Sequence, residues 1–519
     1  MLGRRISLLV LALALVLGAC AGAREPAAPV PGGATLTEAA TATAAATITQ
    51  EDFRQRIGFL ASDDLLGRDT PSPGLQTAGR WLADQFREFG LRPAGDEGGY
   101  MHMWTYDVPV VDAVFELRRG AQTAPATWKR EFFIIPGAGP VTGDGVWAGS
   151  ATQGGMAGGA GMAGNVAFVY LPGESADAAF QQSLTTGMMG AMAGGAAGLV
   201  FVMDARMEAG LVGQIATSIG PGQVAPIPVV GMSYATAERL LADVGQDLEV
   251  LRTRTGGEPH RLDGVRVHAG ATVTSSPAEV ANVAAVLPGS DPALRDTYVV
   301  LTAHYDHVGV GAPDASGDSI FNGADDDASG TAMLVEVAQA LATLPEAPRR
   351  SVLFLAVSGE EKGLLGSGAY VDDPTVPLER IVANINVDMV GRNHPDSVTA
   401  IGLDFSSLGP LATRIAADNP ELGLVIAPDM QPEEDLFARS DHFNFAKHEI
   451  PAIFFTTGLH DEYHLQGDEA ELIAWDKITR IGRLVLYLTH AVAQDPTPPA
   501  WTDEGLEFVR DATRPPGNE

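Results

Sequence analysis

The sequence contains a single cysteine and has far fewer basic than acidic side chains. Its 519 residues include 33 Lys and Arg against 65 Asp and Glu, which gives a formal net charge of −32 at pH 7. One cysteine excludes an intramolecular disulfide, so a hydrophobic core must stabilise the fold. The acidic excess argues against binding to nucleic acid and against a polybasic membrane-surface patch. Because 45% of the residues are hydrophobic, the chain can build two or three domains.

The apolar run near the N-terminus is too short to span a bilayer as a mature anchor. Two arginines precede the run 8–17, and Leu-Gly-Ala precedes Cys20. A basic start, a short apolar run and small residues before a cleavage point are typical of a secretory signal peptide, here residues 1–20. Residues 21–48 are mostly Ala, Thr, Pro and Gly, and this composition predicts a flexible tether.

The segment Leu-Gly-Ala-Cys20 also resembles the lipobox of bacterial lipoproteins, in which the cysteine becomes the lipidated N-terminus. The resemblance implies an exported protein that is held at the bacterial cell envelope, at the outer membrane or the periplasmic face, by lipid at Cys20. The alternative is a plain cleaved signal with an incidental cysteine.

Composition divides the rest of the chain into four parts. Residues 49–107 contain two stretches with helical spacing of apolar side chains. From 108 to 276 charge density falls, glycine content rises and short β-rich runs appear, which predicts a smaller inserted domain. Residues 277–495 alternate apolar strands with helices, and 496–519 are predicted to form a C-terminal tail. Near-continuous apolar strands separated by helices predict an α/β sheet covered on both faces.

Acidic and histidine side chains follow the ends of these strands, where open α/β sheets place their sites. Three consecutive aspartates, Asp325–Asp327, also precede the predicted helix 331–344. Adjacent like charges repel and unpaired aspartates are rarely buried, whereas a divalent cation compensates their charge. The sequence therefore predicts a metal site. Four predicted strands precede these residues: 298–303 precedes His304, 351–357 precedes Glu360 and Glu361, 381–387 precedes Asp388, and 451–457 precedes His464.

These motifs, in this order, resemble those of the two-zinc exopeptidase family that includes bacterial secreted leucine aminopeptidases and glutamate carboxypeptidase. The resemblance covers residues 50–105 and 280–490, and residues 108–276 are similar to the protease-associated domain inserted in many members. It implies a three-layer α/β/α zinc exopeptidase domain with a central mixed, mostly parallel sheet and a smaller inserted β-rich domain. The motifs are His304-Tyr-Asp306, Gly323-Ala-Asp-Asp-Asp-Ala-Ser-Gly, Glu360-Glu361, Asn386-Val-Asp388-Met and His464.

The resemblance also implies a role for each ligand. His304 and Asp388 would hold one Zn²⁺, Glu361 and His464 would hold the other, and Asp326 would bridge them, with a cis peptide bond after it. Zn²⁺ fits this donor set, although Co²⁺ and Mn²⁺ are not excluded by it.

Catalysis in such a site would depend on Glu360 as the general base, which takes a proton from the water between the metals. Asp306 would orient the imidazole of His304. His307 is expected to pack or to form hydrogen bonds rather than to bind metal. Some relatives have a tyrosine that stabilises the oxyanion, and here Phe437 and Arg439 occupy that part of the sequence; Arg439 could take that role or bind a substrate carboxylate.

The activity expected from the resemblance is hydrolysis of N-terminal residues from peptide substrates. A carboxypeptidase or a single-zinc glutaminyl cyclase of the same fold, and a non-catalytic receptor-like homologue, are the alternatives. The tripeptide Ser440-Asp441-His442 suggests a serine hydrolase, but the chain contains no Gly-x-Ser-x-Gly elbow. This tripeptide is therefore expected to line the pocket beside the metals.

The predicted lipid anchor can be tested at Cys20. Wild-type protein expressed in a bacterial host should fractionate with membranes, since a lipidated terminus with more than one acyl chain anchors stably. Cys20→Ser should be soluble or remain unprocessed, as read by fractionation and by mass spectrometry of the N-terminus. Wild-type protein found wholly in the soluble periplasmic or culture fraction would contradict the anchor.

Overall fold

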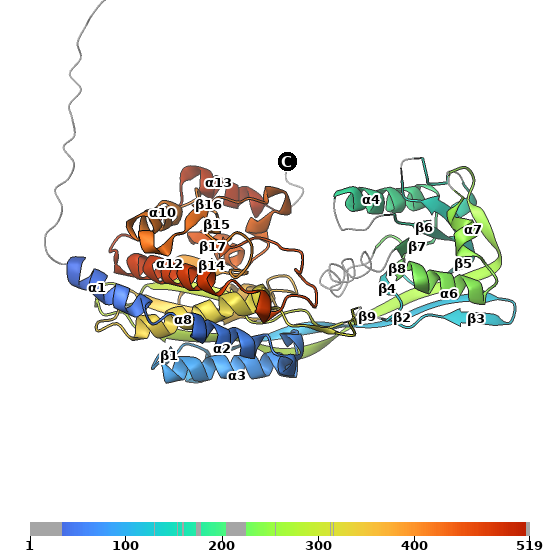
Figure 1. Ribbon diagram of the computed structural model, residues 1–519. Helices are drawn as coiled ribbons and strands as arrows, with labels where there is room; N and C mark the ends of the chain where they lie inside the picture. The colour runs from blue at the N-terminus through green and yellow to red at the C-terminus, as the bar shows by residue number, and fades with distance from the viewer. Residues whose placement is uncertain are drawn as a thin grey trace, which may run out of the picture.

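Two lobes joined by a long antiparallel ribbon make up the molecule (Figure 1). The computed structural model describes residues 34–128, 130–152, 154–157, 160–172, 178–203, 225–254, 256–311, 313–314 and 316–514. The predicted signal peptide, Cys20 and the first part of the predicted tether lie outside these residues, so those predictions stay predictions. Within the described residues, none of the helices has both the length and the apolar character needed to cross a membrane.

The larger lobe is built on a mixed, mostly parallel sheet. Its central strand β10 (Tyr298–His304) is parallel to both β13 (Ser351–Val357) and β14 (Ile381–Val387). β14 is in turn parallel to β17 (Ala452–Thr456). Every residue of β13 is buried, as expected of a strand covered on both faces. The edge beyond β17 is completed by β15 (Ser397–Ile401) and β16 (Val425–Ala427).

Helices cover both faces of this sheet. Side chains of β10 alternate between two cores, because successive residues of a strand point to opposite faces. Val299 and Leu301 pack into the larger core, and Val300 packs into the other. The larger core is covered by α2 (Gln50–Leu60), α3 (Pro73–Glu88), α8 (Gly330–Ala342), α10 (Leu408–Asp418) and α12 (Trp475–Gln494), and the smaller one by α9 (Leu365–Asp372) and α11 (His442–Ala446).

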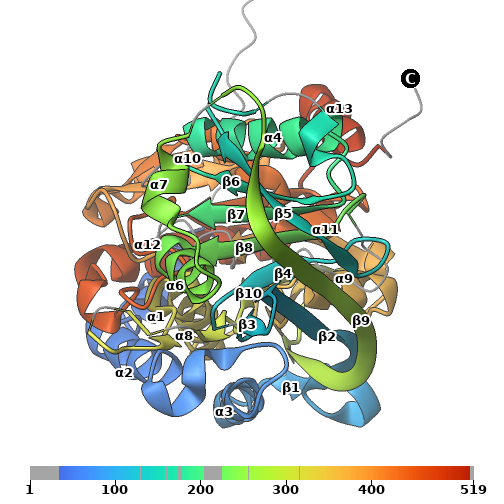
Figure 2. The ribbon, with the colours of Figure 1, turned by 90° about the vertical axis from the view of Figure 1, so that its right-hand side faces the viewer.

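The ribbon consists of β2 (Met101–Arg119) and β9 (His260–Leu287). The two strands pair antiparallel without interruption from Met101 opposite Val283 to Arg118 opposite Arg266, and β9 curves from one lobe into the other (Figure 2). The predicted limits of the insertion, 108 and 276, fall within these strands. The short strands β1 (Arg92–Pro93) and β3 (Gln122–Pro125) pair with β9 and β2 respectively, and β11 (Gly309–Val310) pairs with β12 (Ile320–Phe321).

The sheet continues through β9 into the smaller lobe, where helices again cover both of its faces. Its apolar runs form parallel strands, and two cores flank them: Phe168 packs with α6 and α7, whereas Val169 packs with α4. The strands are β5 (Val141–Ser150), β6 (Val166–Tyr170), β7 (Gly198–Met203) and β8 (Val229–Ser233), with β4 (Phe133–Ile135) antiparallel to β8; the helices are α4 (Ala178–Ala193), α6 (Tyr234–Asp243) and α7 (Leu248–Arg252).

The predicted tether is wrong from Ala34 onwards. Residues Ala34–Ala45 form helix α1, which packs beside α12, and Ile48 is completely buried. The guanidinium of Arg483 donates hydrogen bonds to the carbonyls of Ala45 and Ile48, both at 3.1 Å. Alanine has the highest helix propensity of all residues, and an alanine-rich segment can therefore order once a neighbouring helix covers one side of it.

The predicted C-terminal tail also differs from the structure. Helix α13 (Asp503–Ala512) lies within it and packs on the larger lobe. Val509 is 1% exposed, and the ring centroid of Phe508 lies 4.6 Å from that of Phe405. The burial of Val509 and the ring contact of Phe508 show that α13 is part of the folded lobe.

Replacing Ile48 tests whether the region before α2 is part of the core. Ile48→Ala should lower the free energy of unfolding by about 2–5 kcal/mol, because it removes a completely buried side chain and leaves a cavity. Val425→Ala, at a side chain that is 65% exposed, should change it by less than about 0.5 kcal/mol. Urea denaturation of both variants measures the difference, and equal small effects would restore the interpretation as a tether.

Candidate metal centre

The predicted ligands converge at the carboxyl edge of the larger sheet. His304 is the last residue of β10, Asp388 follows β14, and Glu361 stands in the loop after β13. His464 lies in the loop after β17, and Asp326 lies between β12 and α8. Parallel strands end at the same edge of a sheet, so residues up to 160 positions apart in the sequence meet there.

Asp326 lies between two groups of potential ligands. Its Oδ1 is 3.2 Å from Nε2 of His304, and its Oδ2 is 3.1 Å from Nε2 of His464. Asp388 Oδ1 is 3.5 Å from His304 Nε2, and Glu361 Oε2 is 3.0 Å from His464 Nε2. In each group the potential ligand atoms lie within 4.8 Å of one another, and Asp326 is the one residue that the two groups share.

The three consecutive aspartates have different partners. Only Asp326 faces the ligands; the peptide bond between it and Asp327 is cis, as the resemblance implied. Asp327 accepts hydrogen bonds from the backbone N–H groups of His304 (3.1 Å) and Met389 (3.2 Å). Asp325 accepts one from the N–H of Gly391 at 2.6 Å. The two flanking carboxylates therefore fix the backbone that carries His304 and the segment after Asp388.

A further carboxylate, that of Asp468, accepts hydrogen bonds from the backbone of the aspartate run. Asp468 is completely buried and accepts hydrogen bonds from the N–H groups of Asp325 and Asp326, each at 3.0 Å. Arg68, also buried, donates to the carbonyls of Asn322 (2.8 Å) and Gly323 (3.1 Å). The backbone of this turn is thus held by two charged side chains: Asp468 accepts from its N–H groups, and Arg68 donates to its carbonyl groups.

His307 is a member of the second group. Its Nδ1 lies 2.7 Å from Oε1 of Glu361 and 3.7 Å from Oδ2 of Asp326, and the side chain is completely buried. The hydrogen bond agrees with the expectation that His307 forms hydrogen bonds. Its position at the edge of the ligand cluster was not foreseen, because sequence adjacency to Asp306 gives no direction for the imidazole.

The cluster has the properties of a cation site. Burial alone would raise the pKa of Asp326, but the imidazoles of His307, His304 and His464 hold it well below its usual value. Burial likewise opposes ionisation of Glu361, yet the charge of His464 lowers the pKa of Glu361 to about 2. Asp388 Oδ1 and the Nε2 atoms of His307 and His464 are buried without a hydrogen-bond partner. Unpaired buried donors and acceptors of the N/O type fit Zn²⁺.

Glu360 points to the cavity beside the ligands rather than into the cluster. It lines a cavity together with His304, Asp326 and Asp388, whereas Glu361 belongs to the ligand group. Burial, followed by the charge of Glu361, raises the pKa of Glu360 well above its usual value, although His304 opposes the shift. Adjacent residues after a strand thus present their carboxylates in different directions.

Asp306 lies behind His304. Its Oδ1 is 3.6 Å from Nδ1 of His304, and its backbone carbonyl is 3.3 Å from the same nitrogen. The carboxylate also accepts hydrogen bonds from the Thr70 hydroxyl (3.0 Å) and from the N–H of Glu360 (3.3 Å). Asp306 therefore connects the orientation of the imidazole with that of the Glu360 loop.

The tripeptide Ser440-Asp441-His442 is buried behind the centre and does not line either of the two cavities found there. Ser440 donates a hydrogen bond to Asp388 Oδ2 at 2.7 Å, which leaves Oδ1 directed at the ligands. Both ring nitrogens of His442 lack hydrogen-bond partners, and burial lowers the pKa of His442 to about 3. No hydrogen bond joins this histidine to the serine, so the geometry excludes a serine triad here. The expectation that the tripeptide lines the pocket is wrong.

The sequence prediction missed a tyrosine at the site. Tyr463 lines the cavity of Glu360, and its ring stacks on His464 at 3.9 Å between centroids. Phe437 instead packs among aromatic rings and is 5% exposed. Arg439 also lines the cavity, but it forms an ion pair with Glu434 at 2.9 Å. The position of Tyr463 next to the predicted ligand His464 was the available signal.

Comparison with known proteins finds similarity between the larger lobe and zinc peptidases. Residues 282–489, less than half of the chain, match the family model of Peptidase family M28. A probable zinc metalloprotease of Leptosphaeria maculans is 36% identical over 120 residues, 23% of this chain and 26% of the relative. Aminopeptidase YwaD of Bacillus subtilis is 30% identical over 196 residues, 36% of this chain and 39% of the relative. The chain thus spans well under half the length of these two relatives.

The fold is that of a zinc aminopeptidase of known structure. The structure of BSAP, a zinc aminopeptidase from Bacillus subtilis, aligns with a TM-score of 0.56 over 86% of this chain and 95% of that chain, at 18% identity. This likeness confirms the predicted three-layer α/β fold. The match to family M28 confirms the resemblance to zinc exopeptidases that the five motifs indicated.

The contact between His307 and Glu361 predicts an effect on metal affinity. His307→Ala should weaken zinc binding at one site by about 10–100-fold, the usual effect of removing a side chain that orients a metal ligand. Competition with a chromogenic zinc chelator measures this without an activity assay. His448→Ala, at an exposed histidine, is the matched control and should bind zinc as wild type does. Equal affinities for all three proteins would show that His307 has no part in the centre.

Proposed function

We propose that the protein, whose residues 282–489 match Peptidase family M28, is a zinc-dependent aminopeptidase that removes residues from the N-termini of peptides. The observation that carries this proposal is the position of Asp326 between two ligand groups, with Glu360 facing the adjoining cavity. A carboxylate shared by two sites suits a pair of cations, and the cavity is lined by His304, Asp326 and Asp388 of the first group.

We propose two Zn²⁺ per chain. His304 and Asp388 would hold one, Glu361 and His464 the other, and Asp326 would contribute one oxygen to each. When bound, zinc lowers the pKa of water to about 7 and polarises a carbonyl group. Two cations would also neutralise the carboxylates that the fold gathers at this edge, which otherwise repel one another.

Glu360 is the proposed general base. A carboxylate in a water-poor cavity can accept a proton from the attacking water and deliver it to the leaving amine. Its loop is held by the hydrogen bonds from the N–H of Gly359 to Thr70 (3.2 Å) and from the N–H of Glu360 to Asp306 (3.3 Å). Tyr463 lines the same cavity, so its hydroxyl can donate a hydrogen bond to the oxygen of the reacting carbonyl.

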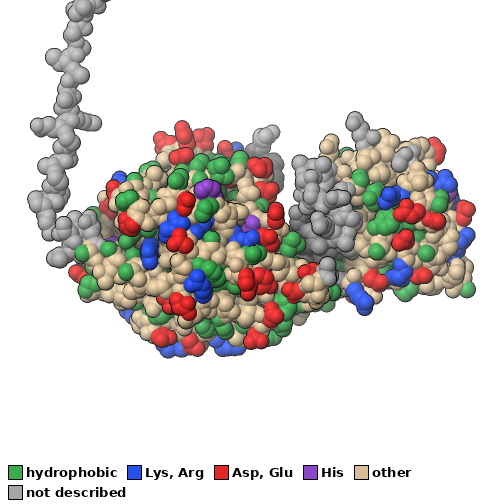
Figure 3. Space-filling view, viewed as in Figure 1, with side chains coloured by type: hydrophobic (Ala, Val, Ile, Leu, Met, Phe, Trp, Pro, Cys, Tyr) green, Lys and Arg blue, Asp and Glu red, His purple; other side chains and the backbone are tan. Residues whose placement is uncertain are grey.

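The charges around the cavity favour an aminopeptidase over a carboxypeptidase. A carboxypeptidase needs a free cation to bind the substrate carboxylate. Among the described residues, Arg439 is the only Lys or Arg that lines this cavity or its neighbour, and it forms an ion pair with Glu434. Acidic side chains are spread, together with Lys and Arg, over the visible face of the larger lobe (Figure 3), and the formal net charge of the chain is −32; a net negative charge attracts the ammonium group of a peptide N-terminus.

A substrate panel tests the proposal directly. The zinc-loaded protein should release p-nitroaniline from aminoacyl p-nitroanilides but not from their N-acetylated forms, and a chelator should abolish the activity. Cleavage of C-terminal residues instead would identify a carboxypeptidase. Cyclisation of N-terminal glutamine with one zinc per chain would identify the cyclase, and inactivity on the whole panel would leave a receptor-like protein.

Two adjacent substitutions separate the base from the ligand. Glu360→Gln should retain both zinc ions and lower kcat by about 10²-fold or more, because the shape is kept and the proton acceptor is lost. Glu361→Gln should weaken one zinc site, and excess zinc should partly restore its activity. Zinc content per chain and kcat are measured for both variants. Loss of zinc in the first variant but not in the second would reverse the two roles.

A further inference from the structure

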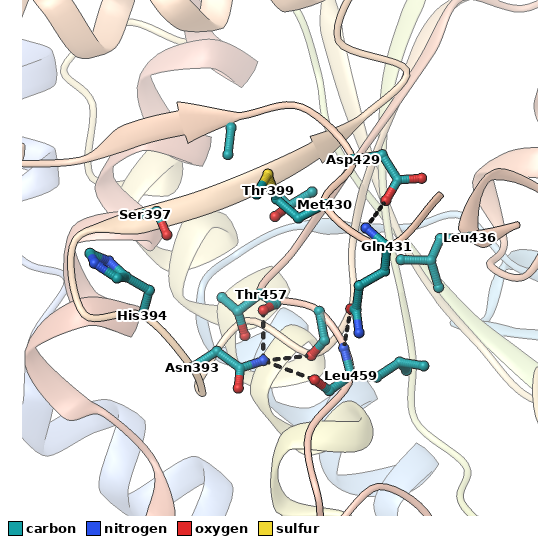
Figure 4. A pocket seen from close by; sticks show the side chains of 12 residues that line it. Asn393, His394, Ser397, Thr399, Asp429, Met430, Gln431, Leu436, Thr457 and Leu459 are labelled. Carbon is teal, nitrogen blue, oxygen red and sulfur yellow. Dashed lines mark hydrogen bonds between the residues drawn. The ribbon is translucent and has the colours of Figure 1, made fainter. Parts of the chain in front are cut away.

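A second cavity lies beside the metal centre and has no part in the proposed chemistry. Its volume is about 390 Å³, large enough for the longest side chains. Leu436, Gly458 and Leu459 line both this cavity and the one that contains Glu360, so the two cavities are adjacent. The other lining residues come from β15, from the end of β16 and from the segments before β15, after β16 and after β17, and Figure 4 labels most of them: Asn393, His394, Ser397, Thr399, Asp429, Met430, Gln431 and Thr457, besides Ala427.

Hydrogen bonds hold the wall between the two cavities in place. The side-chain amide of Asn393 donates to the carbonyls of Thr457 (2.8 Å), Gly458 (3.0 Å) and Leu459 (3.2 Å). From the other side, Oε1 of Gln431 accepts a hydrogen bond from the N–H of Leu459 at 2.9 Å (Figure 4). A wall fixed by two amide side chains forms a preorganised pocket rather than a gap between loops.

The lining combines aliphatic and polar side chains. Leu436 and Leu459, which both cavities share, provide an aliphatic surface next to the metal centre. The residues that line only the second cavity include the hydroxyls of Ser397 and Thr399 and the carboxylate of Asp429. Of the described residues that line this cavity, Asp429 is the only acidic one, and none is Lys or Arg.

Asp429 is also fixed in position. Its Oδ1 accepts a hydrogen bond from the backbone N–H of Gln431 at 2.8 Å, in the same segment that supports Leu459. A carboxylate held this way needs little reorganisation to bind a cation. Lysine and arginine side chains match such a lining, because they combine an aliphatic stem with a cationic end.

The cavity lies on the side of the centre that would hold the N-terminal residue. Its lining includes Asn393 and His394 from the segment that follows Asp388, but no residue of the Glu360 loop. Since the leaving amine must take its proton from Glu360, the departing part of the peptide lies at that loop. The retained residue, whose carbonyl carbon is attacked, lies on the opposite side.

We infer that this cavity binds the side chain of the substrate's N-terminal residue and that Asp429 selects lysine and arginine there. The inference rests on the proposed aminopeptidase function and names its substrate class. The aliphatic stem lies against Leu436 and Leu459, and the cationic end reaches the carboxylate of Asp429. N-terminal residues with acidic side chains are excluded by the same carboxylate.

Pairs of substrates that differ only in charge test this inference. Arginyl and citrullinyl p-nitroanilides have nearly the same shape, and lysyl and norleucyl p-nitroanilides share their stem. The kcat/KM of wild type should be at least about tenfold higher for the charged member of each pair, as expected of a charged hydrogen-bonding partner in a prepared site. Asp429→Asn, which retains an acceptor for the N–H of Gln431, should reduce that ratio to about one.

Glu433→Gln is the matched control, because it removes the same charge from an exposed residue that does not line the cavity. Its charged-to-neutral ratio should equal that of wild type, and urea denaturation should show all three proteins folded. Wild-type protein that cleaves leucyl p-nitroanilide with a ratio near one would overturn the inference while leaving the aminopeptidase function intact. A ratio unchanged by Asp429→Asn would also overturn it. Failure to cleave any aminoacyl substrate, leucyl included, would reject both proposals.

Discussion

Burying several carboxylates together is costly in free energy unless each has a positive or hydrogen-bonding partner, and this constraint organises the larger lobe. Backbone N–H groups take up two of the three consecutive aspartates: Asp327 holds the end of β10 and the segment after β14, and Asp325 holds Gly391. Asp468 accepts hydrogen bonds from the N–H groups of Asp325 and Asp326. Asp326 alone remains free to face the histidines, so the fold selects one carboxylate out of three for the centre.

Much of this arrangement could be predicted from the sequence because it follows from the alternation of apolar runs with polar residues. Apolar runs ending in His304, Glu361 or Asp388 predict buried strands with polar side chains at one edge, and the strands lie within a residue or two of the predicted limits. Two partners could not be predicted. The contact of His307 with Glu361 and the stacking of Tyr463 on His464 depend on side-chain directions in loops, which periodicity does not specify.

Composition was a poorer guide than pattern at both ends of the described chain. Helix α1 is built from small residues with little hydrophobic contrast, and only its contact with α12 shows that it belongs to the core. The second cavity escaped sequence analysis for a similar reason. Asn393, Gln431 and Asp429 stand in irregular polar segments, where the sequence gives no sign of their hydrogen bonds to the backbones of Thr457, Leu459 and Gln431.

The ribbon between the lobes has a mechanical consequence. Strands β2 and β9 are paired through the whole span between the lobes, so neither can slide along the other without breaking the ladder of hydrogen bonds. The ribbon is only one layer thick, however, and a two-stranded sheet twists and flexes readily across its plane. The paired strands therefore fix the distance between the lobes along the ribbon, whereas bending of the ribbon can change the angle between the lobes. Bending of the ribbon would be shared among its many paired residues rather than concentrated at one hinge residue.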